Sequence, residues 1–89
     1  MTWADRFDAL AQMDGDEWED EYTRLKADWT QEYTEKFLNF AVGRGWKLED
    51  AETWPEHLMD DAFSEAHRRQ YDPQLCAQYD VIEVEREAE

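Results

Sequence analysis

Cysteine and histidine are the side chains in this sequence that could supply a nucleophile and a base. The chain has one Cys and two His, and Cys76 paired with His57 or His67 would be a thiol and its general base. However, Cys76 has no Lys or Arg directly beside it to lower its thiol pKa. It follows Leu75 and precedes Tyr79, a pattern typical of a small buried residue. We therefore expect a structural thiol.

Metal-binding patterns fail in detail. His57 and His67 are ten residues apart, whereas a zinc pair on a helix needs a spacing of four. The run Asp14-Gly15-Asp16 resembles the start of a calcium loop, but its fifth position is Trp18 and its sixth is Glu19, where such a loop needs Gly. The sequence predicts no metal site.

Acid–base and phosphate chemistry have no stronger signal. His57 and Asp61 are four residues apart on a predicted helix, where an exposed ion pair is a simpler interpretation than proton transfer. The three glycines form no phosphate-binding loop. We expect a protein that is not an enzyme and that uses no cofactor.

Charge is the dominant feature of the chain. Its 89 residues include 24 Asp and Glu against nine Lys and Arg, for a net charge of −15, together with five Trp, four Tyr and four Phe. Acidic chains poor in apolar surface are usually disordered, but each buried aromatic ring removes about 150–250 Å² from water. We therefore expect a folded domain with an anionic exterior, which disfavours nucleic acid and anionic membranes as direct partners.

Helical periodicity runs through the N-terminal half. Thr2 and Asp5 have the spacing of a capping box, Asp14-Gly15 indicates a turn, Thr30 is predicted to cap a further helix, and a glycine in Gly43–Gly45 is predicted to end it. The clearest amphipathic stripe consists of Trp18, Tyr22, Leu25 and Trp29.

The C-terminal half continues the helical pattern. Trp46–Trp54 predicts a short helix, and Pro55 is predicted to begin the next one because proline is favoured at the first helical position. Asp72-Pro73 predicts another start. Residues 80–85 could be strand, but there is no second strand-like run to pair with them, so helix is favoured. Residues 85–89 are expected to fray.

These elements predict one all-α domain spanning residues 1–89: a small helical bundle of four to six short helices with an aromatic-rich core. A lone Cys and the lack of a long apolar run predict a cytoplasmic protein with no membrane span. The aromatic stripes are expected to pack the core rather than to cradle a cofactor or stack bases. The expected core residues are Trp18, Tyr22, Trp29, Phe37, Phe40, Leu58 and Phe63.

Three explanations of the acidity compete. The charge could simply keep a marginal domain soluble, although about −2 to −8 suffices for a small domain. It could adapt the protein to high salt. It could also imitate a polyanion, because carboxylates three or four residues apart on a helix lie about 5–6 Å apart and approximate the spacing of phosphates along one DNA strand. The residues expected to form this surface are Asp16, Glu17, Asp20, Glu21, Glu49, Glu52, Glu56, Asp60, Asp61 and Glu65.

The chain resembles the small acidic proteins of phages and mobile elements that block host defence by imitating DNA, including anti-CRISPR proteins and inhibitors of restriction enzymes. The resemblance rests on size, net charge, the single Cys and the acid-rich runs 16–21 and 45–54. It implies a non-enzymatic inhibitor in the bacterial host cytoplasm. Its partner would be a basic nucleic-acid-binding complex, with a CRISPR effector as the first candidate and a restriction enzyme as the second.

The alternative is an acidic interaction module that is not a DNA mimic, such as an antitoxin-like, anti-sigma-like or chaperone-like protein. A mimic should compete with DNA for its target, whereas such a module need not. In either case the chain is expected to be a monomer or a homodimer.

Overall fold

The computed structural model describes residues 2–88, and within them every regular element is a helix. The elements are α1 (Trp3–Ala11), α2 (Gly15–Gly43), α3 (Leu48–Ser64), the short 3₁₀ helix η1 (Ala66–Arg69) and α4 (Pro73–Ala88). The all-α prediction is confirmed, and the four α-helices fall in the predicted range. No helix in residues 2–88 combines the length and the apolar character that crossing a bilayer requires.

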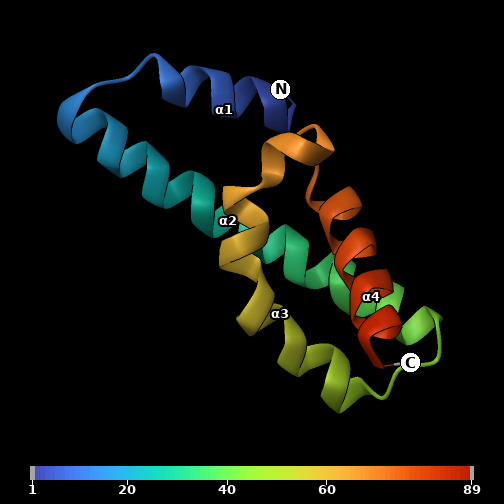
Figure 1. Ribbon diagram of the computed structural model, residues 1–89. Coiled ribbons are helices and arrows are strands. Elements are labelled where there is room, and N and C mark those ends of the chain that lie inside the picture. Colours follow the sequence, from blue (N-terminus) through green and yellow to red (C-terminus); the bar gives the residue numbers. More distant parts are fainter. Residues whose placement is uncertain (1, 89) are drawn as a thin grey trace.

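Helix α2 is the central element. Its 29 residues span about 43 Å at 1.5 Å per residue, close to the 44 Å length of the molecule, which measures 44 × 21 × 21 Å. Figure 1 shows α1 running back along the N-terminal half of α2, while α3 and α4 flank its C-terminal half. The other helices therefore bury their apolar faces against α2.

The buried stripe of α2 explains this arrangement. Its members recur at every fourth position, and because four residues turn a helix by about 400°, the stripe shifts by roughly 40° at each step. It therefore winds around the helix and offers different sides to α3 and to α4. The stripe consists of Leu25, Trp29, Tyr33, Phe37 and Ala41, all fully buried.

Local signals set most helix ends. Thr2 Oγ1 accepts from the Asp5 amide, and Asp5 Oδ2 accepts from the Thr2 amide, both at 3.2 Å, so the capping box is confirmed. The predicted turns at Gly15 and Gly45 also form, with φ of +64° and +97°. Asp72 Oδ1 accepts from the Gln74 amide at 2.8 Å and caps α4.

Two predicted helix starts are wrong. Thr30 does not cap a helix: α2 runs through it, and its hydroxyl donates back to the Lys26 carbonyl at 2.7 Å. Pro55 lies inside α3 rather than at a start. Proline inside a helix costs about 3 kcal/mol because it lacks an amide and clashes with the preceding turn. Here the ring is fully buried beside Ala51 on the core side of α3, and this burial offsets part of the cost.

The expected core is largely right. Trp29, Phe37 and Phe63 are buried, and Tyr22, Phe40 and Leu58 pack against them half-buried. Trp18 was wrongly placed in the core: it stacks on Tyr22 with ring centroids 4.9 Å apart but stays 37% exposed. Trp18 belongs to the amphipathic stripe predicted from the sequence, but it lies close to the N-terminal end of α2, where the other helices cover it incompletely.

The C-terminal segment is helical, as favoured. Helix α4 includes residues 80–85 and runs to Ala88. Of the residues expected to fray, Glu85 accepts hydrogen bonds from Arg44 and Trp46, and Glu89 lies outside the described residues.

The turn before α4 contains two consecutive non-glycine residues in the left-handed region, Gln70 (φ 58°) and Tyr71 (φ 61°). Such positions cost of order 1–3 kcal/mol and need support from their surroundings. Tyr71 receives it from both sides. Its amide donates to the Ala66 carbonyl at 2.8 Å, and its carbonyl accepts from Trp29 Nε1 at 3.1 Å.

Candidate partner-binding surface

Most cations of the chain are already paired. Seven of the nine Lys and Arg side chains form ion pairs of 2.7–3.7 Å within residues 2–88. Of the other two, Arg69 lies 3.8 Å from the ring centroid of Tyr79. The paired carboxylates are Glu21, Asp28, Glu32, Asp60, Glu65, Glu83 and Glu85.

The carboxylates that remain are concentrated in two places. Three more, on Asp5, Asp72 and Asp80, accept hydrogen bonds within the chain, and Glu89 is outside the described residues. Thirteen of the 24 therefore have no protein partner in residues 2–88, and ten of these lie in two short segments. The α2 acidic group is Asp14, Asp16, Glu17, Glu19 and Asp20. The α3 acidic group is Glu49, Asp50, Glu52, Glu56 and Asp61.

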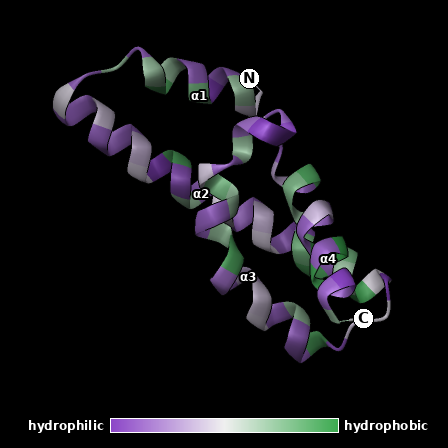
Figure 2. Cartoon of the chain, viewed as in Figure 1, coloured by the Kyte–Doolittle hydropathy of each residue, from purple (hydrophilic) through white to green (hydrophobic). Residues whose placement is uncertain are grey.

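The α2 acidic group surrounds the N-terminal end of its helix, and all its members are exposed. The carboxylates of the first turn, Asp16 and Glu17, are stabilised by the positive end of the helix dipole, by about 0.3–1 kcal/mol each. Hydrophilic residues dominate this end of α2 in Figure 2. The fold can therefore hold these charges close together without pairing each one with a cation.

The α3 acidic group forms a continuous surface because α3 does not break at Pro55. Three of its members, Glu49, Glu52 and Glu56, are spaced by three and four residues on one exposed side of the helix, and Asp60, which is paired with Lys26, follows four residues later on that side. The five unpaired carboxylates from Glu49 to Asp61 lie along about 18 Å of helix axis. This is one charge per roughly 3.6 Å, close to the axial density of a single B-DNA strand.

A paired cation, Lys26, lies where α3 contacts α2. Lys26 Nζ on α2 lies 3.2 Å from Asp60 Oδ1 on α3. Glu19 precedes Lys26 by seven residues, two helical turns, and so shares its face of α2. The Lys26–Asp60 ion pair therefore lies between the α3 acidic group and the α2 acidic group.

The structure leaves seven of the ten predicted site residues exposed and unpaired within residues 2–88, in two separate segments on α2 and α3, and pairs the other three with cations. Asp16, Glu17, Asp20, Glu49, Glu52, Glu56 and Asp61 are exposed and unpaired in the described part of the chain. The other three are paired: Asp60 with Lys26, Glu65 with Arg68, and Glu21 with both Arg6 and Arg24. Sequence reasoning missed Asp14, Glu19 and Asp50, although each lies within two residues of a predicted one.

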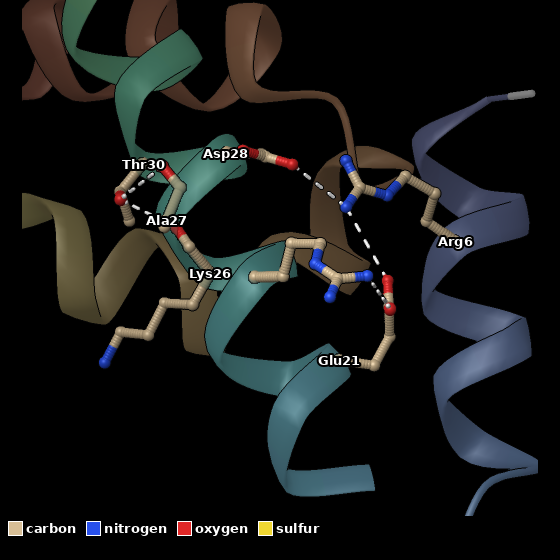
Figure 3. Close-up of polar contacts among 7 residues, drawn as sticks. Arg6, Glu21, Lys26, Ala27, Asp28 and Thr30 are labelled. Atoms are coloured by element: carbon tan, nitrogen blue, oxygen red, sulfur yellow. Dashed lines mark hydrogen bonds and ion pairs between the residues drawn. The ribbon is translucent and has the colours of Figure 1, made fainter. Parts of the chain in front are cut away.

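Glu21 is part of the contact between α1 and α2. Figure 3 shows the Arg6 guanidinium between Glu21 and Asp28. Arg24 forms an ion pair with the same Glu21 carboxylate. The Arg6 Nη2 to Asp28 Oδ2 distance is 3.1 Å, and the Arg24 Nη1 to Glu21 Oε2 distance is 3.2 Å. Glu21 is half-buried by this network, so it is less available to a partner than its neighbours.

Comparisons with protein-family models, with curated proteins and with solved structures find no match to this chain. The function must therefore be argued from its own geometry.

The candidate catalytic groups do not form a site in the described chain. Cys76 is buried, and burial is the main cause that raises its pKa to about 11, so the thiol is a poor nucleophile at neutral pH. His57 is exposed and forms no ion pair with Asp61 in residues 2–88. Within the same residues, no group of three potential ligands could hold a metal ion.

A hydrogen-bonded pair of polar side chains lies between α2 and α4 in the described part of the chain. The buried Tyr33 hydroxyl on α2 donates to Asp80 Oδ2 on α4 at 2.5 Å. Burial, followed by the bond to Asp80, raises the pKa of Tyr33, and burial also raises the pKa of Asp80. This pair joins α2 to α4. The pocket beside Asp80 and Cys76 measures about 30 Å³, room for only a few water molecules.

Proposed function

We propose that this protein is a non-enzymatic inhibitor that binds the basic, DNA-accepting surface of a bacterial defence complex by imitating the charge of double-stranded DNA. A CRISPR effector is the first candidate target and a restriction enzyme the second. The observation that carries the proposal is the concentration of ten unpaired carboxylates on two helical segments. A merely solvated surface would have no reason to leave them grouped.

The physical basis is electrostatic competition. A partner that binds DNA through Lys and Arg would accept a row of carboxylates with the axial density of one strand. The net charge of −15 steers the encounter and raises the association rate at low salt. Because the carboxylates stand on helices packed against a common core, little backbone ordering accompanies binding.

Charge reversal in either acidic group should weaken inhibition. We expect Asp16→Lys with Asp20→Lys, and separately Glu52→Lys with Glu56→Lys, to raise the inhibitory concentration about five- to tenfold, since each exposed charge contributes up to about 1 kcal/mol. The measurement is release of labelled duplex from a panel of purified CRISPR effectors and restriction enzymes. The effect should shrink as salt rises.

The matched control is Glu35→Lys with Glu87→Lys. These two carboxylates are also exposed and unpaired in residues 2–88 but lie outside both acidic groups, and every double variant takes the net charge from −15 to −11. The control should inhibit nearly as well as the wild type. Equal weakening by all three variants would mean that total charge matters and the grouping does not.

Removing the cation between the groups should have the opposite effect. Lys26→Gln is expected to strengthen target binding about two- to threefold at low salt, because the two acidic groups then act without a positive charge between them. Stability should change by less than about 1 kcal/mol, since the Lys26–Asp60 pair is exposed. Lys36→Gln is the control: Lys36 pairs with Glu32 elsewhere on α2, and its exposure, 39%, matches the 38% of Lys26. Stronger binding by both variants would contradict this.

A second candidate function is an acidic interaction module that does not compete with DNA. It is favoured by the large apolar side chains left exposed at the start of α3, Leu48 (56%) and Trp54 (37%), to which duplex DNA has no equivalent. Capture of partners from a bacterial lysate, followed by elution with DNA, separates the two: a mimic releases its partner to DNA, and such a module retains it.

A further inference from the structure

An open groove lies between the start of α3 and the end of α4, where these two helices flank α2. Its volume is about 370 Å³. Four of its lining residues are apolar, and Trp54 is one of the two most exposed Trp side chains in residues 2–88. The apolar lining is Trp46, Trp54, Val84 and Ala88.

One wall of the groove is held rigidly. Glu85 accepts from Arg44 Nε at 2.8 Å and from Trp46 Nε1 at 3.1 Å, and Arg44 Nη2 lies 2.7 Å from the same carboxylate. These bonds, with Arg44 first, lower the pKa of Glu85. The carboxylate stays ionised, and Trp46 is fixed against the core by its edge contact with Phe37. A preformed wall reduces the ordering that binding would otherwise require.

The surroundings of the groove are acidic. Asp50, a member of the α3 acidic group, lines it, and Glu49 and Glu52 stand next to it on the same helix. Lys47 also lines the groove and is unpaired in the described chain. Its one positive charge does not cancel the three negative charges of Glu49, Asp50 and Glu52, so the net charge around the groove is negative. A ligand for this groove must therefore bring an apolar group and positive charge together.

We propose that the groove binds an apolar side chain carried on a Lys- or Arg-rich segment of a protein partner, with Trp54 as the central contact. Tryptophan is enriched among residues that dominate interface energies, particularly in pockets where the surrounding contacts exclude water. A second copy of the chain fits less well, because two copies each carry a net charge of −15 and repel one another. The inference does not depend on DNA mimicry.

The test uses a synthetic helical peptide with Leu on one face and Lys on the other, and a matched peptide in which Gln replaces each Leu. Binding is followed through the indole N–H signals of the five Trp in an NMR titration. We expect the Leu peptide to shift the signals of Trp54 and Trp46 and to bind at least tenfold more tightly than the Gln peptide. Equal affinities would overturn the proposal, because they would mean charge attraction alone.

Two variants locate the contact. Trp54→Ala should weaken binding of the Leu peptide about tenfold, whereas Trp18→Ala, which removes a Trp of the same 37% exposure at the other end of α2, should change it less than twofold. If far-UV dichroism shows that Trp54→Ala does not fold, Ala88→Arg replaces it. Ala88 is exposed at the end of α4 and lines the groove, so an arginine there would fill part of the groove and repel the Lys side chains of the peptide. Unchanged binding by the folded variant refutes the proposal.

Sedimentation equilibrium tests whether a second copy of the chain occupies the groove. We expect the wild-type protein to be monomeric at low salt. A dimer that Trp54→Ala dissociates would assign the groove to a second copy and overturn the proposed partner. Failure of the peptide experiment would leave charge mimicry standing, since that is measured by displacement of duplex from its own targets.

Discussion

Trp29→Ala is expected to lower the free energy of unfolding by about 3–5 kcal/mol. Trp29 is fully buried, stacks on Tyr33 and meets Phe63 edge-on, with both pairs of ring centroids 5.5 Å apart. Its Nε1 is also the donor to the Tyr71 carbonyl, so truncation leaves a cavity and removes a support of the left-handed turn. A chain of 89 residues has a total stability of roughly 4–13 kcal/mol, and we expect the variant to be largely unfolded.

Urea unfolding followed by far-UV dichroism measures this loss. Trp29→Phe keeps most of the ring volume and removes the Tyr71 hydrogen bond, so its smaller loss separates the bond from the cavity. Trp18→Ala is the control, with an expected loss near 1 kcal/mol because its ring is partly exposed and stacks on Tyr22. A loss for Trp29→Ala no greater than that of the control would refute the central place given to this residue.

Tyr33→Phe is expected to lower the free energy of unfolding by about 1.5–3 kcal/mol at neutral pH, the range for a hydrogen bond to a charged group. The substitution keeps the ring between Trp29 and Phe37 and removes only the hydroxyl. Asp80 would then be left half-buried without its donor, and desolvation already raises the pKa of that carboxyl.

The same residue should govern stability in alkali. The pKa of Tyr33 is raised above its ordinary value of 10.0, so above that pH the unfolded chain loses a proton that the folded chain keeps. Wild-type stability must therefore fall as pH rises past about 10. Cys76, whose pKa is raised from 9.0 to about 11, acts in the same direction from about pH 9.

Urea unfolding at a series of pH values checks this behaviour. Tyr33→Phe should flatten the decline above pH ~10, and Cys76→Ala should flatten the part that begins near pH 9. A wild-type stability that is level from neutral pH to pH ~11 would contradict the burial of both groups.

Signals confined to a few adjacent residues predicted the fold well. The Thr2 and Asp5 capping box, the turn glycines and Asp72-Pro73 act within one helical turn, and each forms as expected. The two wrong helix starts have a common cause. Thr30 and Pro55 are starting signals by local preference, but the packing of α2 and α3 favours continuous helices and overrides that preference.

The candidate surface was predicted less completely because pairing is a tertiary property. The acid-rich runs were visible in the sequence, but nothing there indicated that Arg6 would meet Glu21 or that Lys26 would meet Asp60. These contacts arise where α1 and α3 cross α2. They decide which carboxylates are neutralised and which remain available to a partner. Asp14, Glu19 and Asp50 remain available, although sequence reasoning did not predict them as part of the surface.

The dependence of every other helix on α2 also has a consequence for how the chain reaches this structure. Helices form from contacts between near neighbours in sequence, and α1 and α3 each pack directly on the element that precedes or follows them, whereas α4 reaches α2 from more than 40 residues away. Chains dominated by such local contacts fold within about microseconds to milliseconds. A newly synthesised copy could therefore adopt its final shape, with its charges in position, almost as soon as it leaves the ribosome.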